Sequence, residues 1–304
     1  MRRSWRRTGW RTVVSAAVAA VALTGCQAQS SIVPAHEDSP LVIIETASFA
    51  EAEIIGHIYG NALVRQGWRV ENRPQSGTEA EVVDAVASGE ATFTVGFTGE
   101  LLRMFDPSST AVAADEVYPA MVAALPEGVT AGDPAPAEDA PAYVVSENTA
   151  EQMGLSVMSD LAGRCGTLTL GARPEVLADQ ELSRAVGEAY DCGFAARVPL
   201  GSNPGTVRDA LRSGAVGVGV VRSSDPILDE ADLVMLDDDD EAITAQNIIP
   251  VFRKGSLTED QLDLVNRISG ELTDADVREL LVGVDVGTAS PVALANFWLD
   301  EHGY

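Results

Sequence analysis

The chain has 304 residues, 46% of them hydrophobic, and its 46 acidic residues outnumber 20 basic ones for a net charge of −26. A chain this acidic repels nucleic acid and anionic lipid surfaces, so neither is expected as a partner of its surface. Its length and apolar content suit one large or two medium domains with a sizeable core.

The N-terminal residues are typical of a secretory signal. MRRSWRRTGWR carries five arginines and no acidic residue, an apolar run of small residues follows, and LTG precedes Cys26, which resembles a bacterial lipobox. The apolar run is shorter than the roughly 20 residues of a spanning helix. We therefore expect a signal peptide over 1–25, a lipid on Cys26 and a flexible tether over 26–40, which would anchor the protein at the extracytoplasmic face of the cell membrane. The alternative is an ordinary secreted protein with an incidental cysteine.

The remaining cysteines are Cys165 and Cys192. In an exported chain such a pair is expected to form a disulfide, because the compartment is oxidising. The alternative is a metal site, but two thiols without a nearby histidine supply too few ligands for zinc.

From residue 41 on, strand-like and helix-like segments alternate. The first block is predicted to contain strands over 41–46, 69–73 and 91–97 and helices over 48–66, 78–88, 100–105 and 115–126. Capping boxes are expected at Ser48 to Glu51 and at Thr78 to Glu81. The segment 125–141 is rich in Pro, Ala, Gly and acid and is predicted to be a crossing loop.

The pattern then restarts in a second block. Strands are predicted over 143–146, 167–172, 194–200, 215–221 and 233–236, and helices over 174–190 and 205–213. The acidic run 237–241 is read as a solvated loop, with a calcium loop as the alternative that lacks the turn glycine. Segment 245–252 is predicted to return to the first block as a strand, before three helices that start at Ser256, Thr273 and Ser290. This alternation favours α/β layers with mostly parallel sheets.

The two blocks contain a weak internal echo. Residues 77–97 resemble 205–222, since each segment has Gly-Thr, a short helix, Ser-Gly and then an apolar strand. Two similar lobes, with the middle one inserted into the first, would produce this order. Ligands in such lobes bind at the carboxyl ends of strands and at helix N-termini. We therefore expect the corner that begins at Phe97 to face the corner that begins at Arg222 across a cleft.

Motifs of catalysis or cofactor binding were not found. The sequence has no phosphate loop, dinucleotide fingerprint, HExxH or GxSxG motif. Its three histidines are scattered, and His57 is read as a residue of a helix face rather than a base. We therefore expect neither an enzyme nor a cofactor.

Several segments, taken in order, carry a family resemblance. The segments are SFAEAEIIGHIYGNALVRQGWRV, SGEATFTVGFTGELL, LGARPEV, ALRSGAVGVGVVRSSDPIL and the C-terminal ELTDADVRELLVGVDVGTASPVALANFWL. They resemble segments of the substrate-binding lipoproteins of ABC importers for glycine betaine, choline and carnitine. The resemblance implies a type II periplasmic-binding-protein fold with two lobes that close on a ligand. It also implies a permease partner and a box of aromatic rings around a quaternary ammonium.

The resemblance carries over to some residues of the box. Phe97 matches one ring, Tyr143 is a possible substitute for another, and Arg208 and Arg222 stand where aromatic residues are expected. The arginines suit a carboxylate of the ligand; the alternative is ion pairing with acids such as Asp209, Asp225 or Glu100. The predicted ligand-binding residues are Phe97, Thr98, Tyr143, Arg208, Arg222, Thr46, Ser48, Thr78 and Thr206. For Thr78 and Thr206 the alternative is a plain helix cap.

The sequence thus predicts lobe 1 over 41–140 plus 246–304 and lobe 2 over 141–245. The expected function is extracytoplasmic capture of a small solute, nominally a quaternary-ammonium osmoprotectant, for an ABC importer. The alternative is a lipoprotein that keeps the fold and acts as a partner or sensor without transport.

Overall fold

The computed structural model describes residues 39–304 except 202, 286 and 288. The predicted signal peptide and the lipid on Cys26 lie outside the described residues. None of the helices in the described part of the chain has the length and apolar content needed to span a membrane.

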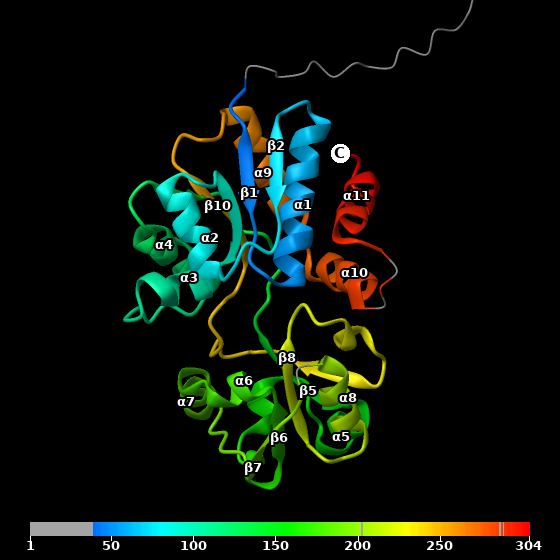
Figure 1. Cartoon of the computed structure of the whole chain (residues 1–304). Helices are drawn as coiled ribbons and strands as arrows, with labels where there is room; N and C mark the ends of the chain where they lie inside the picture. The colour runs from blue at the N-terminus through cyan, green and yellow to red at the C-terminus, as the bar shows by residue number, and fades with distance from the viewer. Residues whose placement is uncertain (1–38, 202, 286, 288) are drawn as a thin grey trace, which may run out of the picture. The chain divides into compact units, whose positions relative to one another are not determined.

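The first five-stranded sheet has the order β2-β1-β3-β10-β4 (Figure 1). Its strands are β1 (Val42–Glu45), β2 (Val70–Arg73), β3 (Phe93–Phe97), β4 (Val129–Ala131) and β10 (Ile248–Arg253). Strands β1, β2 and β3 are parallel, whereas β10 is antiparallel to both of its neighbours, with Ile248 opposite Phe97.

The second five-stranded sheet repeats this arrangement with the order β7-β6-β8-β5-β9. Its strands are β5 (Pro141–Ser146), β6 (Thr169–Ala172), β7 (Ala196–Pro199), β8 (Val218–Arg222) and β9 (Leu233–Leu236). Again three strands are parallel, and β5 is antiparallel to both neighbours, with Pro141 opposite Arg222. The predicted α/β class with mixed, mostly parallel sheets is confirmed.

Helices cover both faces of each sheet. Those of the first sheet are α1 (Ala50–Arg65), α2 (Glu79–Ser88), α3 (Thr98–Phe105), α4 (Ala114–Ala124), α9 (Glu259–Glu271), α10 (Asp274–Asp285) and α11 (Pro291–Glu301). Those of the second sheet are α5 (Glu147–Met153), α6 (Pro174–Ala178), α7 (Gln180–Ala189) and α8 (Pro204–Arg212). Successive residues of β5 enter opposite cores, Tyr143 one and Val144 the other, as the pleat requires.

The helix caps were predicted with mixed success. Thr78 and Glu81 form the expected capping box, in which the Glu81 carboxylate accepts a hydrogen bond from the Thr78 N–H at 2.7 Å. The box expected at Ser48 is wrong, because Phe49 is the N-cap of α1 and makes no side-chain hydrogen bond. The Ser48 N–H donates to the Gly77 carbonyl at 2.8 Å, so Ser48 lies one residue before the cap and Glu51 is too early in the helix to complete a box.

Three expected boundaries were also wrong. The helix predicted over 174–190 is divided at Asp179, whose carboxylate caps α7 by accepting the N–H of Glu181 and of Leu182, each at 3.0 Å. The predicted crossing loop 125–141 includes the short strand β4. Helix α9 is capped by Thr258 rather than Ser256, and α5 was not expected at all.

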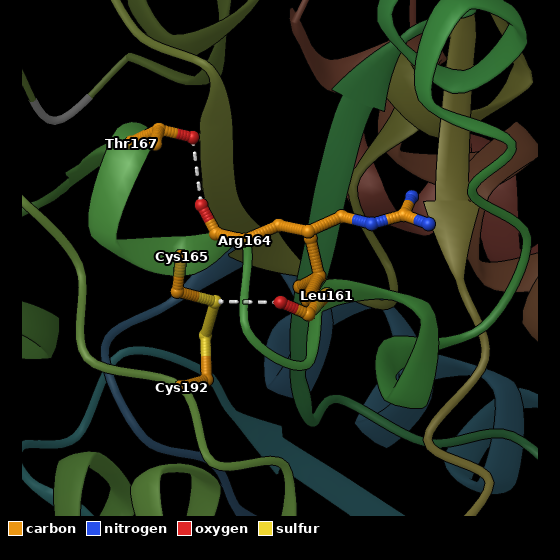
Figure 2. The surroundings of a disulfide bond; sticks show 5 residues. All are labelled: Leu161, Arg164, Cys165, Thr167 and Cys192. Carbon is orange, nitrogen blue, oxygen red and sulfur yellow. Dashed lines mark hydrogen bonds between the residues drawn. A yellow bond between two sulfur atoms is a disulfide. The ribbon is translucent and has the colours of Figure 1, made fainter.

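Cys165 and Cys192 form a disulfide, as predicted (Figure 2). Both residues are buried in a core of the second sheet. Cys165 begins a short 3-10 helix, η2 (Cys165–Thr167), which is closed where the Thr167 hydroxyl donates to the Arg164 carbonyl at 2.8 Å. The bond therefore ties the end of α7 to the turn that precedes β6.

Candidate functional site

The corner after β3 holds another segment of the chain. The Thr98 hydroxyl donates to the Ala245 carbonyl at 3.2 Å and accepts the Asn247 N–H at 3.0 Å. A Cβ on Gly99 would lie only 2.6 Å from that same carbonyl, so only glycine permits this close approach. The corner therefore fixes the segment that leads from the second sheet into β10.

The corner after β8 does the same for the segment that enters β5. The Ser223 hydroxyl accepts the Ala140 N–H at 3.0 Å and donates to the Glu138 carbonyl at 2.9 Å. The Arg222 Nε and Nη2 and the Ser224 hydroxyl donate to the carboxylate of Asp139. The internal echo thus corresponds to two matching corners, each fixing the crossing segment that leads into the antiparallel strand of its own sheet.

The two crossing segments also pair with each other. Glu138 and Asn247 form an antiparallel bridge, and the Asp139 N–H donates to the Gln246 carbonyl at 3.0 Å. Two short segments that connect two sheets and are held at each end have the form of a hinge.

A cavity of about 200 Å³ lies at the carboxyl ends of β6 and β8, against the first turn of α1. Ligand sites of α/β folds occupy this position. It is lined by Ala50, Glu51, Arg173, Gly201, Val207, Val220, Val221, Arg222, Ser224, Asp225, Pro226 and Leu281. Of the predicted ligand-binding residues, Arg222 belongs to this lining.

The ionisable groups around the cavity perturb one another. Burial raises the pKa of Glu51, and the negative charge of Asp139 raises it further. Burial by itself would lower the pKa of Arg222, but the carboxylates of Asp139, Glu100 and Glu51 together outweigh burial and raise it. Burial also raises the pKa of Glu79, whose carboxylate accepts the Phe97 N–H at 3.1 Å, to about 7. These shifts mark the region as one where charges are removed from water.

The two predicted aromatic residues lie inside cores. Phe97 is 3% exposed and stacks on Phe49 with 5.6 Å between ring centroids. Tyr143 is also 3% exposed and stacks on Phe194 at 6.5 Å. Neither residue lines the cavity, so their contact with a ligand remains a prediction.

Arg208 is engaged in ion pairs. Its Nε donates to Asp209 at 3.0 Å and its Nη1 to Glu230 at 3.1 Å. Arg212 pairs with the same Glu230 at 2.6 Å, so the three side chains form a network on α8 and the segment before β9. For Arg208 this matches the ion-pair alternative with Asp209.

The small polar residues have local roles. The Thr206 hydroxyl donates to the Asn203 carbonyl at 2.7 Å, while the cap of α8 is the side chain of Asn203. Thr78 caps α2, which agrees with the alternative interpretation of this residue as a plain helix cap. Thr46 follows β1 and is 2% exposed, and its hydroxyl has no hydrogen-bond partner among the described residues.

A second, larger cavity of about 620 Å³ lies between α3 and α7, against the segment that leads into β10. Arg103 of α3 approaches Asp179 to 3.7 Å at its edge, but it also pairs with Glu100 in its own helix. Both arginine and acid side chains there are about a third or more exposed, so this ion pair is weakened by solvent.

Sequence reasoning missed the charged residues that line or adjoin the cavity, namely Glu51, Arg173, Glu79 and Asp139. A signal was present for two of them. Arg173 directly follows a predicted strand in the quoted LGARPEV corner, and Glu51 lies in the first turn of a predicted helix. Asp139 carries no local pattern, because its partners Arg222 and Ser224 are more than 80 residues away in the chain.

Comparison with known proteins agrees with this architecture. A family model described as the substrate binding domain of an ABC-type glycine betaine transport system matches residues 40–301. A crystal structure of a glycine betaine/carnitine/choline ABC transporter protein superposes with a TM-score of 0.76 at 21% identity, covering 86% of this chain and 99% of the other. Apo YehZ from Escherichia coli gives 0.75 at 20% identity, over 87% and 99%. Lactococcal OpuAC, closed on glycine betaine, gives 0.57 at 17% identity, over 87% and 97%.

Proposed function

Because the chain belongs to the family of substrate-binding domains of ABC-type glycine betaine transport systems, we propose that it captures a small solute between two lobes and delivers it to a membrane permease. The fold is that of the two-lobed periplasmic binding proteins. In this proposal lobe 1 comprises 41–140 plus 246–304, and lobe 2 comprises 141–245.

The observation that carries the proposal is a cavity with charged side chains from both lobes beside a two-segment hinge. Glu51 of lobe 1 and Arg222 of lobe 2 line the same cavity, and Arg222 is hydrogen-bonded to the hinge residue Asp139. Closure about such a hinge would bring both lobes onto a bound solute and take it out of water. Glycine betaine is the first ligand to test, since the family description names it.

We also propose that the protein is a lipoprotein, with a signal peptide over 1–25 and a lipid on Cys26. Metabolic labelling with radioactive palmitate should label the wild-type protein and not the Cys26→Ser variant. Without label on the wild type, the lipid anchor must be given up, while solute capture would remain open to its own test.

Uptake decides the main proposal. A strain without this gene should lose saturable uptake of one or more of radiolabelled glycine betaine, choline, carnitine and the protein amino acids, and the wild-type gene should restore it. Calorimetry on the full-length protein should find saturable binding of the same compound.

A second function is favoured by one observation. Phe97 and Tyr143 are packed into cores, and none of the described residues that line the cavity is aromatic. A partner or sensor lipoprotein without transport predicts silence in both assays across the whole solute panel. Binding together with lost uptake would exclude it.

A further inference from the structure

The cavity presents opposite charges from its two sides. Lobe 1 contributes the carboxylate of Glu51, and lobe 2 contributes the guanidinium groups of Arg173 and Arg222. Asp225 also lines it, but its side chain caps the turn that follows by accepting the Ile227 N–H at 3.1 Å. Besides Asp225, the charged groups that line the cavity are therefore one anion on lobe 1 and two cations on lobe 2, of which Arg222 is paired with Asp139.

Glu51 makes no direct ion pair. Among the described residues, no basic side chain lies within ion-pair distance of its carboxylate. Burial and the neighbouring Asp139 raise its pKa, while the charges of Arg222 and Arg173 across the cavity act in the opposite direction. A cation in direct contact would stabilise the ionised carboxylate further. A ligand ammonium group would supply that cation.

The two arginines have N–H groups that could donate hydrogen bonds to a ligand. Arg222 is held by Asp139 through Nε and Nη2, and its Nη1 makes no hydrogen bond to the described residues. The nearest acid to Arg173 is Glu175, whose side chain is 64% exposed and 3.5 Å away. A ligand carboxylate could therefore bind both guanidinium groups with charge-assisted hydrogen bonds.

Size and chemistry restrict the solute further. A volume of about 200 Å³ lies below the roughly 300–1,000 Å³ of pockets for drug-sized ligands, which suits a solute of amino-acid size. A trimethylammonium group has no N–H to donate to Glu51 and is bound best by ring faces, which the cavity lining lacks. A carboxylate instead favours an ammonium that carries N–H groups.

Building on the proposed function, we propose that the transported solute is a small amino-acid zwitterion whose ammonium group bears N–H donors. Glu51 binds the ammonium and Arg173 and Arg222 bind the carboxylate. Because the two charges of the solute contact different lobes, only the closed protein satisfies both.

A methylation series tests the N–H requirement. Full-length protein is titrated calorimetrically with glycine, N-methylglycine, N,N-dimethylglycine and glycine betaine, and with proline and N,N-dimethylproline. Within each series the carboxylate is constant, and only N–H groups are replaced by methyl groups. In at least one series, the fully methylated member should bind at least tenfold more weakly than its best N–H-bearing relative.

Variants test the named side chains. Glu51→Gln and Arg173→Gln should each weaken binding of the best N–H-bearing compound at least tenfold. Glu53→Gln is the matched control on α1, since its carboxylate binds Gln75 at 2.7 Å outside the cavity, and Arg197→Gln is the control on the second sheet. Both controls should bind as the wild type does, and thermal unfolding without solute should show all four variants folded.

The outcomes separate this inference from the proposed function. If glycine betaine or choline binds most tightly, or if the only solute that binds lacks either a carboxylate or an ammonium with N–H groups, the inference is overturned and solute capture stands. Binding that neither Glu51→Gln nor Arg173→Gln weakens also overturns it. If no solute binds and uptake is unchanged in the deletion strain, the proposed function fails and the inference fails with it.

Discussion

Arg222 donates two hydrogen bonds to the buried carboxylate of Asp139, one of them from Nε at 2.8 Å. Asp139 lies on the first crossing segment, whereas Arg222 ends β8, 83 residues later in the chain. The hydroxyl of Ser224 donates a hydrogen bond to the second oxygen of the Asp139 carboxylate. This ion pair therefore connects the first crossing segment, the second sheet and the cavity that Arg222 lines.

Breaking this ion pair on one side should destabilise the protein strongly. Arg222→Met leaves the Asp139 charge buried without a cation, which costs about 3–5 kcal/mol in such sites. The free energy of unfolding from urea titrations measures the loss. The double variant Arg222→Met/Asp139→Asn should lose less than Arg222→Met alone, because no charge is then left unpaired.

Arg208→Met is the control for this experiment, since its ion pairs are on the surface. It should destabilise the protein much less than Arg222→Met does. Equal effects of the two substitutions would show that burial of the Asp139 pair has no energetic consequence.

Glu79 should make stability depend on pH in a defined window. Burial raises its pKa to about 7 from the usual 4.5, so the folded state binds the proton more tightly than the unfolded state. The contribution of Glu79 to stability is therefore fully present below pH 4.5 and is lost as the pH rises through 7.

The variant Glu79→Gln isolates this contribution, because the amide oxygen can still accept the Phe97 N–H. It should be more stable than the wild type by about 3 kcal/mol at pH 8 and show no such gain at pH 4.5. Urea titrations across this range measure the difference, with Asp84→Asn on the exposed face of α2 as control. A pH-independent difference would show that the carboxyl titrates normally.

Phe97→Ala should lower the free energy of unfolding. The ring is 3% exposed and stacked on Phe49, and truncation of such a core phenylalanine costs about 3–5 kcal/mol. Phe297→Ala is the control, because Phe297 is 48% exposed and should change stability by no more than about 0.5 kcal/mol. Chemical denaturation measures both. A stable Phe97→Ala variant with weakened betaine binding would support the ligand role predicted from sequence instead.

The disulfide should contribute about 3–4 kcal/mol, which is the chain-entropy estimate for its separation of 27 residues. The double variant Cys165→Ala/Cys192→Ala should lose this amount in urea. Dithiothreitol should destabilise the wild type similarly and leave the double variant unchanged. If the reductant shifts neither protein, the bond makes no net contribution.

The fold was predictable because its signals are local. Alternating apolar strands and capped helices indicated α/β layers, and the capping box at Thr78 and Glu81 was correct. The helix break at Asp179 was missed, since one aspartate is compatible with either a helix interior or a cap until the surrounding packing selects one. The box at Ser48 was wrong because a hydrogen bond to Gly77, far along the chain, fixes that serine outside the helix.

The sequence by itself determined the family, the class of the fold, the disulfide and the internal echo, all of which depend on residue types at short spacing or in a fixed order. Only the tertiary structure decided what the echoed corners hold. Thr98 and Arg222 were predicted from sequence as ligand-binding residues, and the structure shows in addition that each is hydrogen-bonded to a crossing segment. The physical reason is that hydrogen bonds and ion pairs between residues 80 to 150 positions apart depend on which strands the sheets bring together, and no local pattern records that pairing.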